Sequence, residues 1–266
     1  MVYSCPKPQG NGPLVEVFPD VWAVEGRVTM GPGMSITRNM TIIRQGSELA
    51  IVNSVRLMPK EEKELEQLGT VKHLVRLCED HGMDDPYFAE RYKPTVWVSG
   101  EGMGWSKEAG LKAEKVLGKD GAPFPELIEP VIMSKDYLKV PGDASLIVKK
   151  QKGILVASDS IMCYGNRKQD LKLSNQQDSL MAKPVLWMMG FSGRIITPPL
   201  FFKHHSCNGQ ASGVMPELKK LAAADWDAII PCHGLVIKDG AKVLYSKWLD
   251  AKFKSAAATP PATATQ

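Results

Sequence analysis

The pattern of apolar and polar positions divides the chain into two β-rich parts, each followed by helix and strand units. In residues 14–54, short alternating or apolar runs (LVEVF, VWAVEG, ITRNMTIIRQ, LAIVNS) are separated by Pro-Asp, Gly-Pro-Gly and Gly-Ser turns. Such spacing predicts a meander of hairpins. Residues 59–68 begin with proline, have glutamates near the start and end before Gly69, so they predict a helix. The β-branched run 71–77 then predicts a buried strand.

The alternation of helix and strand continues after residue 77. We expect a helix to about Tyr92 and then a strand over Thr95 to Val98, and residues 106–117 predict an amphipathic helix. From Pro130 the β pattern returns in VIM, YLKV, ASLIVKK and GILVAS, and the last two predict a hairpin around a short basic turn. Two β-rich parts with helix and strand units predict an α/β fold, a four-layer αββα sandwich in which two mixed β-sheets pack face to face with helices outside.

Length and composition agree with one large domain. The chain has 266 residues, of which 44% are hydrophobic and 23% charged, enough to bury a full core. We expect an N-terminal extension over residues 1–13, one domain over residues 14–250, and a disordered tail over residues 251–266, which end in the low-complexity run SAAATPPATATQ.

The charge pattern and the cysteines limit the classes of partner that we expect. The net charge is +4, with Lys and Arg scattered among Asp and Glu. The sequence therefore has no basic stripe of the kind that binds a phosphate backbone, and we expect no nucleic-acid partner. No uncharged run approaches the length of a membrane span, and the start of the chain lacks a basic and then apolar run. We therefore expect a cytoplasmic protein with a small-molecule substrate. The five cysteines form no CxxC pair and are odd in number, which predicts free thiols. Cys232 is adjacent to His233 and could be a ligand or a small core residue, and packing is the favoured role because free cysteine is among the most buried residue types.

The most apolar stretch is residues 181–202, which Lys183 and Arg194 interrupt. Besides ordinary core, it could form a lid over a pocket or a contact between subunits, so a homodimer stays open. His204 and His205 follow it directly. They could line a pocket, but we expect a surface pair.

Polar side chains gather where the strand 71–77 ends, at His81, Asp84 and Asp85. The carboxyl ends of strands in α/β folds are where ligands and catalytic groups collect. A structural alternative is that Asp84 or Asp85, placed before Pro86, starts a helix, and that His81 is a turn residue.

Two further strands end in residues that can bind metal. Asp159 follows residues 153–157, and His233 follows residues 228–231. Three strand ends with imidazole or carboxylate groups predict that they converge on one divalent ion.

The order and spacing of these motifs, from Val15 to about Leu249, resemble the metallo-β-lactamase superfamily. The residues that carry the resemblance are Asn53 in LAIVNS, the corner His81-Gly82-Met83-Asp84-Asp85-Pro86 in place of HxHxDH, Val140-Pro141-Gly142-Asp143 in place of a PGH turn, Asp159 in LVASDS, and the final His233-Gly234. The corner keeps His81 and Asp85 and has lost histidines at Met83 and Pro86. The pattern looks like a divergent branch with an HGxDDP corner.

This resemblance implies the metal ligands His81, Asp85, Asp159 and His233. With two histidines missing, it implies one divalent ion, with zinc first and manganese or iron as alternatives. Such an ion would lower the pKa of a bound water, which implies a metal-dependent hydrolase acting on an ester-, thioester- or lactone-like bond. Asp85 and Asp143 are the candidate catalytic residues. Asp143 or Asp84 would accept the proton or hold the ligand imidazoles.

Two other functions stay open at this point. The loss of two ligand histidines is also expected of a non-catalytic binding or scaffold protein that retains the fold with a degraded metal site. Carboxylate-rich members of the superfamily hold iron for redox chemistry, but they need a flavin domain or partner that this chain is too short to contain.

Overall fold

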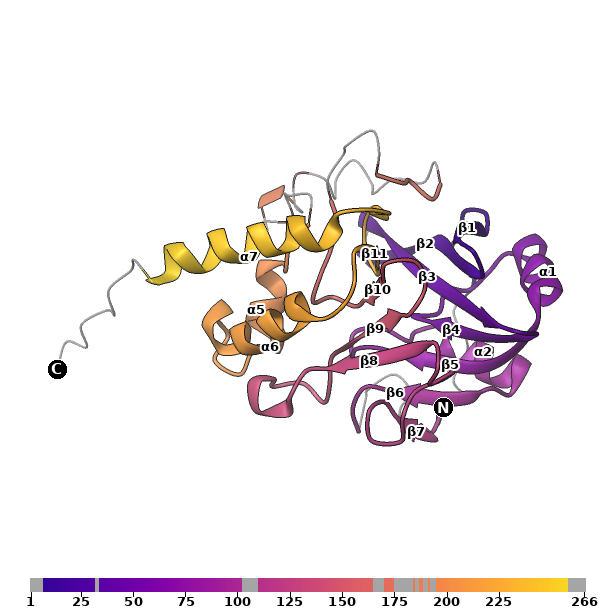
Figure 1. Cartoon of the computed structure of the whole chain (residues 1–266). Coiled ribbons are helices and arrows are strands. Elements are labelled where there is room, and N and C mark those ends of the chain that lie inside the picture. The colour runs from indigo at the N-terminus through magenta and orange to yellow at the C-terminus, as the bar shows by residue number, and fades with distance from the viewer. Residues whose placement is uncertain are drawn as a thin grey trace.

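The chain folds into four layers, helix, sheet, sheet and helix (Figure 1). The structure is a computed structural model that describes residues 7–31, 34–101, 110–164, 170–174, 184, 187–188, 191 and 195–257. Everything below concerns these residues.

The first sheet has seven described strands, which are hydrogen-bonded in chain order. They are β1 (Val15–Phe18), β2 (Val21–Gly31), β3 (Met34–Gln45), β4 (Glu48–Val52), β5 (Thr70–Arg76), β6 (Thr95–Val98) and β7 (Lys115–Val116). Neighbours from β1 to β4 are antiparallel, which confirms the predicted meander. Neighbours from β4 to β7 are parallel, so the sheet is mixed.

The second sheet has four described strands in the order β11-β10-β9-β8. They are β8 (Ile128–Ile132), β9 (Ala144–Val148), β10 (Ile154–Ala157) and β11 (Ala228–Pro231). The pairs β8 with β9 and β9 with β10 are antiparallel, whereas β10 with β11 is parallel, so this sheet is mixed too.

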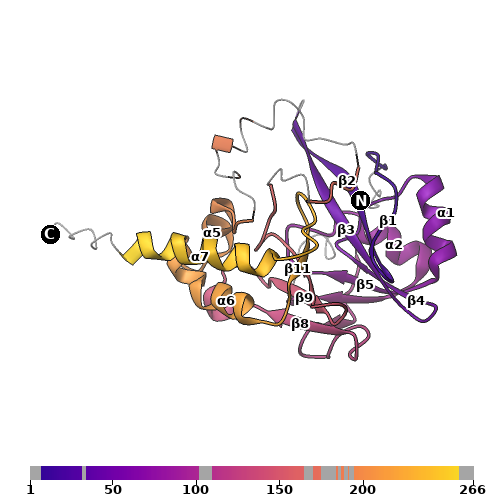
Figure 2. The same ribbon diagram turned by 45° about the horizontal axis from the view of Figure 1, so that its top comes forward.

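Helices cover the outer face of each sheet (Figures 1 and 2). The described helices are α1 (Pro59–Leu68), α2 (Asp85–Tyr92), α5 (Pro199–His205), α6 (Ala211–Ala223), α7 (Ala241–Ala257) and the 3₁₀ turn η1 (Lys135–Tyr137). Leu65 of α1 and Phe88 of α2 pack with Leu74 on the outside of the first sheet. On the other side, α5, α6 and α7 pack against the second sheet.

The alternation along a strand explains why the layers form. In β10, Ile154 and Val156 belong to the apolar cluster shared by the two sheets, whereas Leu155 and Ala157 belong to the cluster under α5, α6 and α7. Successive side chains of a strand point to opposite faces, so a wholly apolar strand is buried between two layers. The predicted four-layer sandwich is confirmed.

Some predicted elements differ. Residues 115–116 of the predicted helix 106–117 form β7, an edge strand that hydrogen-bonds to β6, while 102–109 lie outside the described residues. The helix α7 continues to Ala257, so the predicted tail from residue 251 begins as helix. Much of the apolar stretch 181–202 also lies outside the described residues. Among the described helices, none combines the length and hydrophobicity needed to cross a bilayer.

Candidate metal centre

The corner after β5 is held by hydrogen bonds to its backbone. Asn53 lies at the end of β4, and its side-chain oxygen accepts the Leu77 N–H at 3.4 Å. The guanidinium of Arg76, which is 1% exposed, donates to the carbonyl oxygens of Cys78 at 3.2 Å and Glu79 at 2.9 Å. These contacts hold the backbone that presents the next residues, Asp80 and His81.

Asp84 anchors the far end of the corner. Its carboxylate forms a buried ion pair with Arg38 of β3 and accepts the backbone N–H of Arg56 at 2.7 Å. It precedes the first residue of α2, where the sequence allowed a helix start, but its side chain does not cap the helix. Asp84 therefore ties the corner to β3 and to the segment after β4.

Asp85, a predicted ligand and catalytic residue, is the first residue of α2 and is fully buried. Its Oδ1 accepts a hydrogen bond from the Ser54 hydroxyl at 2.6 Å. Burial raises the pKa of this carboxyl, while Ser54 and Arg76 oppose the rise. Asp85 is not among the described residues that converge as a metal-binding group. The helix start turns its carboxylate towards Ser54, so the structure does not bring it into the site.

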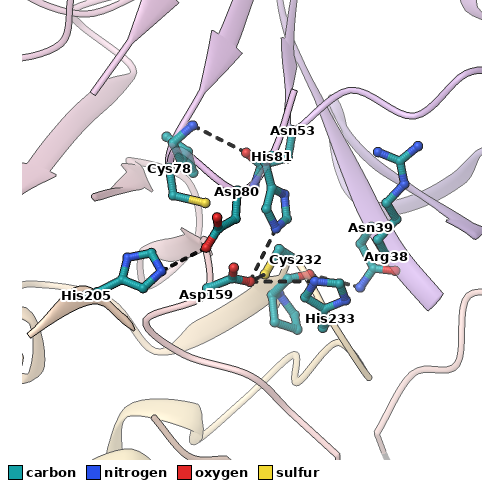
Figure 3. A network of polar contacts seen from close by, with 12 residues as sticks. Arg38, Asn39, Asn53, Cys78, Asp80, His81, Asp159, His205, Cys232 and His233 are labelled. Carbon is teal, nitrogen blue, oxygen red and sulfur yellow. Dashed lines mark hydrogen bonds and ion pairs between the residues drawn. The ribbon is translucent and has the colours of Figure 1, made fainter. Parts of the chain in front are cut away.

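Three predicted ligands do converge, and a cysteine joins them (Figure 3). One ligand atom each from His81, Asp159, Cys232 and His233 lies within 4.8 Å of all the others. Asp159 Oδ1 is 3.3 Å from His81 Nε2 and 3.6 Å from His233 Nε2, and it accepts from the Cys232 thiol at 3.1 Å. We call these four residues the His/Cys group. The strand ends that carry them, after β5, β10 and β11, are those that the sequence predicted to meet.

A contact behind His233 orients its ring. The Nδ1 atom lies 2.6 Å from the Thr37 carbonyl oxygen, so the nitrogen that donates there is Nδ1, and Nε2 faces Asp159 with its lone pair. Burial lowers the pKa of this imidazole. A neutral imidazole with a fixed tautomer is the form that binds metal.

The charge at Asp159 also fits a ligand. Burial alone would raise the pKa of this carboxyl, but His81 and His233 lower it well below its usual range. Burial and the Asp159 carboxylate raise the pKa of the Cys232 thiol, which donates to Asp159. Two imidazoles, one thiol and one carboxylate form a four-donor set of the types that zinc prefers. The residues present therefore fit one divalent ion.

A second cluster shares Asp159. Asp80, Asp159 and His205 also place one ligand atom each within 4.8 Å of one another. Figure 3 shows Asp159 in the middle, with Asp80 and His205 on one side and the other members of the His/Cys group on the other. The predicted surface position of His205 is wrong, because this residue is 2% exposed, contacts Asp80 at 3.0 Å and stacks on Phe201. His204 is exposed, as predicted. The Asp80 hydrogen bond raises the pKa of His205, although burial opposes it.

Asp143, the second predicted catalytic residue, lies beside this cluster. It is fully buried, and its backbone pairs with Cys78 as an isolated bridge. Neither carboxylate oxygen has a hydrogen bond of ordinary geometry from the described residues. Burial raises the pKa of this carboxyl well above its usual value, while His205 opposes the rise. A fully buried carboxyl with a strongly raised pKa is typical of functional sites.

Three residues of the site are not among the ligands predicted from the sequence: Cys232, Asp80 and His205. For Cys232 a signal existed, since it is adjacent to His233, but packing is the favoured role because free cysteine is among the most buried residue types. Asp80 is adjacent to His81 and could have been considered. His205 meets Asp80 only because α5 folds over the second sheet, 125 residues along the chain, and no local pattern encodes that contact.

Comparisons with known proteins agree with the architecture. No family model and no curated protein sequence matches the chain. Among solved structures, the FIM-1 metallo-β-lactamase from Pseudomonas aeruginosa in its mono-zinc form is 15% identical, with a TM-score of 0.53 over 94% of this chain and 99% of that one. The DIM-1 metallo-β-lactamase exposed to ceftazidime is 11% identical, with a TM-score of 0.54 over 94% and 100%.

A metallo-β-lactamase from Erythrobacter litoralis, with β-mercaptoethanol in its active site, is 12% identical, with a TM-score of 0.56 over 90% of this chain and 96% of that one. These likenesses span nearly the whole of each chain. The protein therefore has the fold of the metallo-β-lactamase superfamily. At such low identity the likeness concerns the fold, and the function has to be argued from the site.

Proposed function

We propose that this protein is a metal-dependent hydrolase that holds one divalent ion, with zinc as the first choice, and cleaves an ester-, thioester- or lactone-like bond. The observation that carries the proposal is the His/Cys group, in which four ligand atoms from three separate strand ends lie within 4.8 Å of one another. Imidazole, thiol and carboxylate groups that converge in this way are the donor types of zinc sites. Manganese and iron fit less well, because the thiol favours a softer ion.

A divalent ion at this position would supply Lewis acidity and lower the pKa of water, which is what hydrolysis near neutral pH requires. The residues of the chain prepare the site for it. Asp159 stays ionised between two imidazoles, and the Thr37 carbonyl fixes the ring of His233. The corner anchored by Arg38 and Arg76 keeps His81 in place.

Asp143 and the pair of Asp80 and His205 supply proton-handling groups beside the His/Cys group. A carboxyl with a raised pKa can hold and release a proton closer to neutral pH than an ordinary one. We assign Asp143 this role in the proposed reaction, as the sequence predicted. Asp85 and Asp84, which hold the corner, serve as positioning residues.

The test compares two cysteines. Zinc-loaded protein is assayed with p-nitrophenyl and thioester substrates, and Cys232→Ala is compared with Cys207→Ala, which alters an exposed thiol. We expect Cys232→Ala to weaken zinc binding by about tenfold or more and to reduce hydrolysis, with Cys207→Ala unchanged. Equal zinc affinity in both variants would contradict the ligand assignment. Zinc binding without hydrolysis of any substrate would favour the non-catalytic binding protein.

A further inference from the structure

A pocket opens beside the site and has two chemically different ends. Its volume is about 220 Å³, and its polar part consists of Asp80, Asp159 and His205. The rest of its wall is mainly apolar, from Met162, Phe191, Pro198, Leu200 and Phe201, with His204 at the edge. Asp159 thus belongs both to the His/Cys group and to this pocket.

The apolar wall is built from the core and leads to the surface. Phe201 is 2% exposed and stacks face to face on His205, with ring centroids 4.7 Å apart. Met162 and Phe191 are also buried, whereas Leu200 is 37% exposed and lies at the mouth. A buried wall with an exposed rim can accept an apolar group without unfolding the segment that forms it.

The charges around the pocket select against anions. None of the described residues that line it is a lysine or an arginine, and Asp80 and Asp159 contribute two carboxylates. A phosphate or carboxylate that lay against Asp80 would find only the imidazoles of His204 and His205 among the described lining residues to offset its charge. The part of a substrate that fits is neutral and apolar.

We infer that the pocket binds the short apolar acyl group of a neutral ester or thioester, with the acyl carbonyl next to the position where the His/Cys group would hold its ion. This rests on the proposed hydrolase function and specifies its substrate class. In the reaction the carbonyl carbon gains a bond to the oxygen of water, the bond to the alcohol oxygen or thiol sulfur breaks, and the leaving group takes up a proton. The volume is below the roughly 300 Å³ at which pockets for larger ligands begin, so the acyl chain is short.

The experiment measures kcat/KM of the zinc-loaded protein for p-nitrophenyl acetate, butyrate, hexanoate and decanoate. Each methylene that the pocket buries should raise kcat/KM about fourfold, so butyrate, with two more methylenes, should exceed acetate by roughly fifteenfold. The rise should stop at a short chain, because the pocket is small. Leu200→Trp, which fills the mouth, should move the optimum towards acetate.

The control is Val243→Trp, which changes an exposed apolar residue of α7 that is not part of the pocket wall. It should leave the chain-length profile unchanged, and the melting temperature of both variants reports whether they fold. Zinc-dependent hydrolysis that is equal for all chain lengths, or that Leu200→Trp does not alter, overturns the acyl pocket and leaves the hydrolase standing. If no ester is hydrolysed by protein that holds zinc, the proposed function fails and the acyl pocket fails with it.

Discussion

The buried ion pair between Arg38 and Asp84 should contribute a large part of the stability of the corner that carries His81. The two side chains are 9% and 3% exposed, and Arg38 also donates to the Ser54 carbonyl oxygen at 3.2 Å. Replacing Arg38 by methionine keeps most of the volume but leaves the Asp84 carboxylate buried without its cation. Loss of one partner of a buried pair costs about 3–5 kcal/mol, a large share of the roughly 5–15 kcal/mol by which domains are stable.

The assay is urea unfolding at pH 7, followed by tryptophan fluorescence. We expect Arg38→Met to lower the free energy of unfolding by about 3 kcal/mol or more. Adding Asp84→Ala should recover part of this loss, since the uncompensated charge is then removed, giving a coupling energy of about 2 kcal/mol between the two positions. The matched control is Lys152→Met, which breaks an exposed pair with Asp239 and should change stability by less than about 0.5 kcal/mol.

The reasoning would be refuted if Arg38→Met cost no more than Lys152→Met, or if the double variant lost as much as the two single variants added together. Either result would mean that the corner is held by its backbone hydrogen bonds alone.

Three further predictions concern stability. Leu74→Ala empties a fully buried position under α1 and α2 and should cost about 2–5 kcal/mol in the same urea assay; a cost below 1 kcal/mol would show that this layer is loosely packed. Gly234→Ala should destabilise by more than about 1 kcal/mol, because Gly234 has φ of +94° and a Cβ there would lie 1.9 Å from the Cys163 carbonyl oxygen; an unchanged melting temperature would exclude this strain. Lys150 and Arg44 lower the pKa of Asp20, so this exposed carboxylate stabilises the fold above its unfolded pKa, near 3.8, and that stabilisation is lost as the pH falls through the lowered folded pKa. Asp20→Asn should therefore cost less than about 1 kcal/mol at pH 7 and nothing in strong acid, and a difference that grew on acidification would contradict the sign.

The fold could be predicted because its signals are local. Alternating or wholly apolar runs of four to twelve residues show which strands are half-buried and which lie between two layers. The strands β9 and β10 are buried along their whole length, and their sequences ASLIV and ILVA contain one polar residue between them. The edge strand β7 has only two residues, too few for any pattern, so residues 106–117 were predicted as helix instead.

The site was predictable only where a ligand directly follows a strand. Asp159 and His233 each come two residues after the end of β10 and β11, and parallel pairing of these strands brings their ends together. The choice within the corner was harder, because His81, Asp84 and Asp85 are close in sequence but point to different partners. Only the fold shows that Arg38 and Ser54 engage the two aspartates and that His81 is left to face Asp159.

The most direct test of the account is the metal content of the purified protein, prepared without chelator and analysed for elements. We predict one equivalent of zinc per chain in the wild type, and less than about a tenth of that in Asp159→Ala, because Asp159 touches all three other members of the His/Cys group. Cys207→Ala should keep the wild-type content. Two equivalents of zinc in the wild type would contradict the single-ion site, and no metal after supplementation, or a full equivalent in Asp159→Ala, would contradict the site itself.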